Sequence, residues 1–116
     1  MHELSIMQGV LDMVRDSAVQ NGINRINKLK LVIGSLTMIM PDSLRFAFEV
    51  LSQEEMFREA ELQIEAVPAV IKCQACNGET AQEDVYCFVC SACGSNQVEV
   101  IKGREMYLDY YEGDCV

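Results

Sequence analysis

The sequence has one histidine, His2, and only 9 lysines and arginines against 18 aspartates and glutamates. Any Ser-His-Asp or Cys-His catalytic set would have to use this lone histidine at the start of the chain, and no such pair is visible. The glycines are scattered, so there is no glycine-rich loop to bind phosphate. The net charge of −9 argues against a surface that grips nucleic-acid phosphates. We therefore expect neither an enzymatic activity nor a nucleic-acid partner.

The sequence also has no apolar run near the ~20 residues of a membrane span. Its first residues, Met1-His2-Glu3-Leu4, lack the basic and apolar regions of a signal peptide. We therefore expect a cytoplasmic protein without a membrane partner. Because thiols stay reduced in the cytoplasm, the six cysteines indicate metal ligands before a disulfide framework, which is the alternative.

The strongest motif is a pair of Cys-x-x-Cys sequences, Cys73–Cys76 and Cys90–Cys93, separated by 13 residues. Each can place two thiolates on one tight turn, and two such turns facing each other give the tetrahedral four-sulfur site of a structural zinc ion. Gly78 and Gly94 follow the pairs, where each turn often needs a positive φ. The sequence therefore predicts zinc bound by Cys73, Cys76, Cys90 and Cys93.

A second set of zinc ligands is possible because Cys87-Phe-Val-Cys90 overlaps the second pair. In that alternative, Cys87 and Cys90 complete the site and Cys93 is spare. We prefer Cys93, because Gly94 follows it and nothing flexible follows Cys90 in the overlapping motif.

Hydrophobic periodicity predicts five further elements. They are a helix from near the start to Asn21-Gly22, a strand over 28–33, a helix from Pro41, a strand over 61–67 and a strand over 105–111. Three strands with helices on one face make a stable layer, so the last strand is expected to join the first two. The fold class is then α+β: a small three-stranded sheet with two helices, plus an inserted zinc-ribbon-like lobe with two Cys-x-x-Cys knuckles. We expect residues 1–69 with 104–116 to form one α+β domain and 70–103 to form the zinc-binding lobe.

The same patterns predict which side chains face the core. The first helix has an apolar stripe at spacings of three and four, widened by Val10 and Met13. In the second helix Val50 widens a similar stripe. Alternation predicts that Leu62, Ile64 and Ala66 share the inner face of one strand. It also predicts that Met106, Leu108 and Tyr110 share a face of the last strand.

His2 stands beside the α-amino group of Met1 and before Glu3. The amine, the His2 amide nitrogen and the imidazole can bind one metal ion together, because the chelate rings that they close are five- and six-membered. Three nitrogens suit Ni(II) or Cu(II) in tetragonal geometry, and Glu3 could add an oxygen. The alternative is that His2 is an end residue without a task.

Several segments together resemble the HypA/HybF family of nickel metallochaperones, and the resemblance runs the whole chain. The matching segments are Met1-His2-Glu3-Leu4-Ser5, Ile33-Gly34, residues 41–49, the two cysteine pairs and Gly103-Arg104-Glu105. The resemblance implies that Ni(II) is bound as cargo by His2, the Met1 amine and Glu3. It implies structural zinc on Cys73, Cys76, Cys90 and Cys93.

The resemblance also implies partners. These are a GTPase of the [NiFe]-hydrogenase maturation system and the hydrogenase large-subunit precursor, with delivery to urease in some bacteria. The chain is expected to be a monomer or a homodimer. It departs from the family pattern at Ser91, where proline is common, and in its extra Cys87 and Cys115. Asp42 lies near the position of an acidic nickel-ligand candidate of some members.

Three other functions compete with nickel delivery at this point. The main alternative is a zinc-ribbon adaptor that acts through protein–protein contacts. A four-thiolate site could also hold iron in a rubredoxin-like electron carrier. A thiol oxidoreductase is the third, but it needs one reactive pair rather than two facing pairs.

Overall fold

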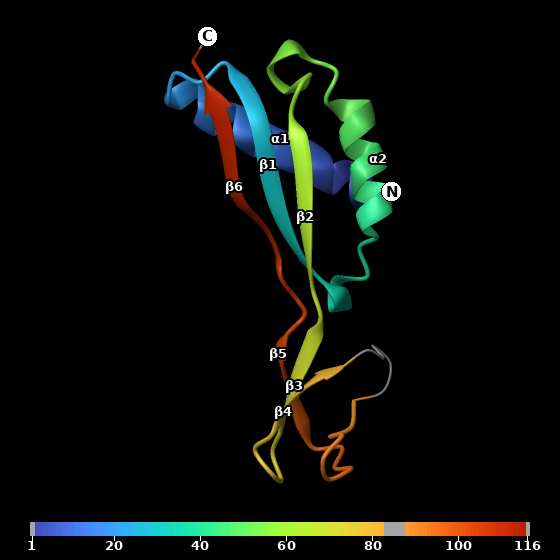
Figure 1. The fold of residues 1–116 in the computed structure, drawn as a ribbon. Coiled ribbons are helices and arrows are strands. Elements are labelled where there is room, and N and C mark those ends of the chain that lie inside the picture. Colours follow the sequence, from blue (N-terminus) through green and yellow to red (C-terminus); the bar gives the residue numbers. More distant parts are fainter. Residues whose placement is uncertain (1, 83–87, 116) are drawn as a thin grey trace. The chain divides into compact units, whose positions relative to one another are not determined.

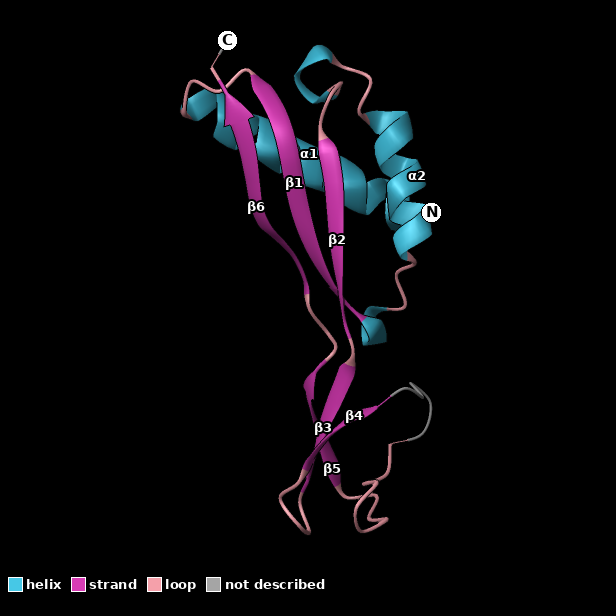
Figure 2. Cartoon of the chain, viewed as in Figure 1, coloured by secondary structure: helices cyan, strands magenta, loops and turns pink. Residues whose placement is uncertain are grey.

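The computed structural model describes residues 2–82 and 88–115. Figure 1 shows the chain coloured along its sequence, and Figure 2 separates helices from strands. The helices and strands are α1 (His2–Gln20), β1 (Arg25–Gly34), α2 (Pro41–Leu51), β2 (Glu61–Val67), β3 (Ala69–Cys73), β4 (Glu79–Gln82), β5 (Val98–Lys102) and β6 (Met106–Asp114). Short 3₁₀ turns lie at Ser35–Thr37 and Glu55–Phe57. No helix in the described ranges is long and apolar enough to cross a membrane.

The strands form two three-stranded sheets, ordered β2-β1-β6 and β4-β3-β5. The chain divides into two compact units that follow these sheets. The first unit contains Met1–Val32, Ile39–Glu65 and Tyr107–Val116, and the second contains Ile33–Met38 and Ala66–Met106. The predicted α+β class, with two helices, a three-stranded sheet and a two-knuckle cysteine lobe, is confirmed.

The core of the first unit lies between its sheet and α1, which runs behind the three strands in Figure 2. Met7, Leu11, Val14 and Ala18 of α1 are fully buried, as their helical spacing predicts. Ile26, Leu29 and Leu31 of β1 are also fully buried. Each large side chain buried in this way stabilises the fold by about 1.5–3 kcal/mol.

Two residues expected to widen the apolar helix stripes instead face solvent: Met13 and Val50 are 50% and 48% exposed. Val50 was expected to join the buried face of α2, which consists of Leu44, Ala47 and Phe48. At 3.6 residues per turn it lies more than a quarter of a turn from the centre of that face. Val10 is buried, so the wider stripe is correct on one side of α1 only.

The strand predictions for Ala66 and Tyr110 are wrong. Leu62 is buried and Ile64 half-buried, but Ala66 is exposed near the end of β2. In β6 the alternation changes phase after Asp109, so that Tyr111 turns inward and Tyr110 is exposed. The hydroxyl group of Tyr111 lies 2.6 Å from Ser17 Oγ of α1, in a part-buried hydrogen bond that fixes the new phase.

The second unit is built on β3, which pairs with β4 and β5 in antiparallel fashion. Ala69, Ile71 and Cys73 alternate along β3 and are buried, so the strand ends directly in the first cysteine knuckle. Ser35–Thr37 and the end of β1 belong to the same unit. There the Gly34 N–H donates to the Glu105 carbonyl at 2.7 Å, and the Leu36 N–H donates to the Gly103 carbonyl at 2.8 Å.

Candidate metal centres

The first knuckle is a tight turn that follows β3. The Cys73 N–H donates to the Gly78 carbonyl at 2.8 Å, and the Asn77 N–H donates to the Cys73 carbonyl at 2.9 Å. The residue with positive φ is Asn77, at 60°, and not Gly78 as the sequence suggested. Asparagine tolerates this left-handed conformation better than most other side chains, so the turn closes one residue earlier than predicted.

The second knuckle repeats the same two hydrogen bonds. The Cys90 N–H donates to the Ser95 carbonyl at 2.8 Å, and the Gly94 N–H donates to the Cys90 carbonyl at 2.8 Å. Gly94 has a φ of +75°, as expected from its place after the cysteine pair. The two Cys-x-x-Cys sequences thus form two knuckles closed by the same backbone bonds.

The knuckles bring four sulfur atoms together. The sulfurs of Cys73, Cys76, Cys90 and Cys93 all lie within 4.8 Å of one another. The Cys73 and Cys93 sulfurs are 3.5 Å apart, and those of Cys76 and Cys90 are 3.6 Å apart. A tetrahedron with Zn–S bonds of about 2.3 Å has sulfur–sulfur edges of about 3.8 Å. All four cysteines are free thiols, so the donor set fits a four-thiolate metal ion.

The surroundings of these thiols favour a bound cation, as their pKa values indicate. The backbone N–H groups of Cys76 and Ala75 point at the Cys73 sulfur and lower the pKa of Cys73 to about 6. The Ser95 N–H favours the thiolate of Cys93, but the neighbouring Cys73 and Cys90 outweigh it and raise the pKa of Cys93 to about 12. Four thiolates at this spacing repel one another, and a bound dication removes that penalty.

Two further cysteines are not part of the predicted zinc set. Cys87, the ligand in the alternative set, lies outside the described residues. Cys115 follows β6 in the first unit and is exposed.

The start of the chain belongs to the first unit. α1 begins at His2, while Met1 lies outside the described residues. Glu3 and Asp42, from the first turns of α1 and α2, both line a cavity of about 320 Å³. Leu4, Ser43, Phe46 and Ala47 complete its wall. Sequence reasoning had named both carboxylates but had no signal that they share one cavity.

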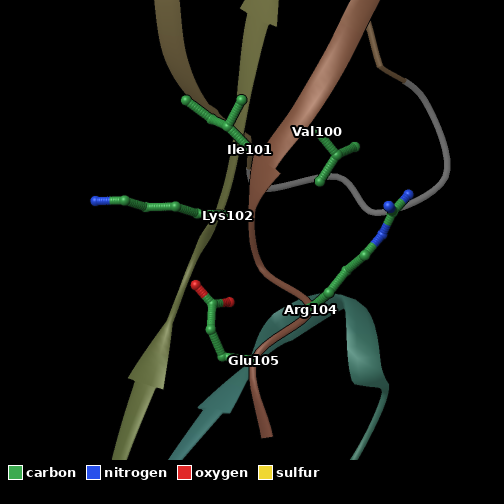
Figure 3. Close-up of a pocket in the computed structure, with 5 residues that line it drawn as sticks. All are labelled: Val100, Ile101, Lys102, Arg104 and Glu105. Atoms are coloured by element: carbon green, nitrogen blue, oxygen red, sulfur yellow. The ribbon is translucent and has the colours of Figure 1, made fainter.

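A second cavity, of about 300 Å³, lies in the second unit beside β5 (Figure 3). Val100, Ile101, Lys102, Arg104 and Glu105 line it. Glu105 is held by its own turn, because its carboxylate accepts a hydrogen bond from the Gly103 N–H at 2.7 Å. The Gly103-Arg104-Glu105 motif therefore has a structural role that its sequence alone did not reveal.

Together, the fold and the four-cysteine cluster define a small α+β metal-binding protein with a cysteine-knuckle lobe. Residues 1–113 match the family described as "Hydrogenase/urease nickel incorporation, metallochaperone, hypA". The chain belongs to this family, as its resemblance suggested.

Curated relatives agree with this assignment, and two solved structures are similar in fold. The chain is 39% identical to the hydrogenase maturation factor HypA of Moorella thermoacetica, over 98% of this chain and 100% of the relative. It is 43% identical to that of Syntrophus aciditrophicus, over 90% and 91%. The solution structure of the Ni metallochaperone HypA from Helicobacter pylori has a TM-score of 0.64 at 22% identity and covers 96% of each chain. A second HypA solution structure has a TM-score of 0.71 at 24% identity and covers 100% of this chain and 98% of that one. These structures show a shared fold.

Proposed function

We propose that this protein is a nickel metallochaperone that binds Ni(II) at its N-terminus and delivers it for the maturation of [NiFe]-hydrogenase. The observation that carries the proposal is the family match over residues 1–113, which includes the chelating start Met1-His2-Glu3. The family description also mentions urease, which we propose as a second recipient. The chain acts by binding and docking rather than by catalysis, in the cytoplasm. Its partners are a maturation GTPase and the precursor of the hydrogenase large subunit.

The position of His2 at the start of α1 supports a nickel site there. The first four N–H groups of a helix have no partner within the helix, so the His2 amide nitrogen is available to a metal ion. A helix N-terminus is electropositive and opposes a bound cation. The carboxylates of Glu3 and Asp42 offset this, and their shared cavity supports Glu3 as an additional ligand.

The proposed ligands also provide a way to release the nickel ion. An amine or an imidazole binds a metal ion only when it is deprotonated, and their ordinary pKa values are about 7.7–8.0 and about 6.5. Nickel must therefore displace protons when it binds near neutral pH. Protonation of the same nitrogens returns the ion without a large conformational change.

We propose that Cys73, Cys76, Cys90 and Cys93 hold structural zinc. The convergence of their sulfurs supports this choice over the alternative set with Cys87. Beyond its cysteines, the described part of the second unit buries only three hydrophobic residues, Ile33, Ala69 and Ile71. So small a core cannot stabilise a lobe alone, and metal binding supplies the missing folding free energy.

The test of nickel binding is a titration of His2→Ala alongside the unaltered chain, with elemental analysis for zinc. We expect His2→Ala to abolish nickel binding, because it removes the imidazole, while one zinc per chain is retained. Equal nickel affinity in the two proteins would overturn the proposed nickel site.

A further inference from the structure

Each cysteine knuckle contributes one buried and one exposed sulfur to the four-cysteine cluster. The sulfur of the buried Cys73 lies 3.5 Å from that of the exposed Cys93. The sulfur of the buried Cys90 lies 3.6 Å from that of the exposed Cys76. Both contacts cross from one knuckle to the other. Solvent therefore reaches one sulfur of each cross-knuckle pair, while its neighbour lies beneath the surface.

An exposed sulfur beside a second cysteine is the arrangement that a redox-sensitive pair of thiols requires. A peroxide oxidises the exposed thiolate to a sulfenic acid, and the neighbouring cysteine then resolves the sulfenic acid to a disulfide. The sulfurs of a disulfide are about 2.05 Å apart, so each cross-knuckle pair has to close by only about 1.5 Å. The described part of the chain contains two such pairs, and both belong to the cluster.

Building on the proposed zinc site, we propose that the cysteine cluster is a reversible peroxide-sensitive switch, in which two cross-knuckle disulfides replace the zinc ion. The bonds are Cys73–Cys93 and Cys76–Cys90. Only thiolates bind the metal ion, so a cluster whose four sulfurs are paired in disulfides has no ligand left to hold it. Zinc release and disulfide formation are then one event.

The chemistry of each bond balances with one peroxide. The Cys93 sulfur attacks a peroxide oxygen, an S–O bond forms as the O–O bond breaks, and the displaced hydroxide takes a proton to become water. The Cys73 sulfur then attacks the sulfur of the Cys93 sulfenic acid, an S–S bond forms as the S–O bond breaks, and a second hydroxide takes a proton. The two thiolates together lose two electrons, which reduce the peroxide to two waters. Cys76 and Cys90 react with a second peroxide in the same way.

The spacing of the paired cysteines along the chain explains why the switch is reversible. Cys73 and Cys93 are 20 residues apart, and Cys76 and Cys90 are 14 residues apart. Disulfides that close loops of this length restrict the unfolded chain and thereby favour the folded one. The second unit has a small hydrophobic core, so these bonds take over the role of the zinc ion in holding the knuckles together. Reduction returns four thiols that are already close enough to bind zinc again.

The test treats the zinc-loaded full chain with hydrogen peroxide in the presence of a colorimetric zinc chelator. We expect peroxide to release the zinc ion, whereas the chelator alone leaves it in place. Reduction with dithiothreitol followed by addition of zinc should restore one zinc per chain. The matched control carries Cys87→Ala and Cys115→Ala, which leave only the four cluster cysteines of the six in the chain, and we expect the same release.

Peptide mapping of the oxidised control variant identifies the disulfides. Cleavage after Glu79 and Glu83 separates the two knuckles, so only cross-knuckle bonds keep their peptides together. We expect the two peptides to stay linked until they are reduced. Fragment sequencing of the linked peptides should then assign the bonds as Cys73–Cys93 and Cys76–Cys90.

The proposal is overturned if peroxide leaves the zinc ion bound, or if the knuckle peptides separate because the disulfides lie within each knuckle. It is also overturned if the control variant no longer releases zinc, because a cysteine outside the cluster would then be the reactive one. Zinc that is present before treatment and retained after it identifies a failed switch on a correct zinc site. A chain without zinc before treatment contradicts the proposed zinc site itself.

Discussion

Cys73 and Cys90, the first cysteine of each knuckle, are buried, whereas Cys76 and Cys93 are exposed. The buried sulfurs are the ones whose pKa values are lowered, and the largest cause in each case is a backbone N–H of the same knuckle. These bonds orient the buried sulfurs. The exposed sulfurs then close the site from the solvent side, so all four cysteines should be needed.

The zinc ligands can be separated from the spare cysteines by single substitutions. We expect Cys93→Ala to lose zinc and unfold the second unit, because three thiolates and a small core cannot hold it. Cys87→Ala should keep one zinc per chain. Elemental analysis with amide hydrogen exchange across 66–106 measures both effects. Loss of zinc in Cys87→Ala together with its retention in Cys93→Ala would show that the alternative ligand set is correct.

The elements that carry strong periodicity could be predicted from sequence, and those that depend on contacts could not. The stripe of α1 and the place of β2 followed from spacing alone. Because Tyr110 and Tyr111 are adjacent and alike, the sequence pattern could not show which of them faces inward. Tyr111 does so, and its hydroxyl group bonds Ser17, 94 residues away. In the first knuckle, the sequence likewise could not show that Asn77 rather than Gly78 adopts the positive φ. The short strands β3, β4 and β5 are too brief for a clear period, and backbone pairing defines them.

The close approach of Gly34 to Gly103 is a further contact that sequence did not show, although both residues belong to motifs of the family resemblance. A Cβ on Gly34 would clash with the Gly103 carbonyl oxygen, and Gly103 itself has a φ of +119°. Gly9, in the middle of α1, has nothing within 4 Å of its Cβ position. The two glycines thus provide a matched pair for the same substitution.

We expect Gly34→Ala to destabilise the protein by about 2–3 kcal/mol, because backbone must move to admit the methyl group. Gly9→Ala should stabilise it by about 0.5–1 kcal/mol, since alanine favours a helix interior. Thermal unfolding followed by circular dichroism measures both changes. An unchanged melting temperature in Gly34→Ala would contradict this prediction and mean that the backbone at Gly34 can move away from its neighbour at little cost in free energy.

At the scale of the whole molecule, the proposed function gives the chain two metal sites of opposite character. The four-thiolate cluster has its ligands in fixed knuckles, which suits an ion that stays. The proposed nickel site uses groups at the very start of the chain, which suits an ion that leaves. Spacing predicted a four-cysteine site and left the choice between Cys87 and Cys93 open, whereas the shared cavity of Glu3 and Asp42 required the structure.

The most direct test of this account is a nickel titration of the chain with its native N-terminus and of a chain extended by one residue before Met1. The extension leaves His2, Glu3 and the zinc site intact but converts the Met1 amine into an amide, which is a far weaker ligand. We predict that nickel affinity falls strongly in the extended chain and is unchanged when the extra residue is added after Val116. Equal nickel affinity in the native and N-terminally extended chains would contradict the account.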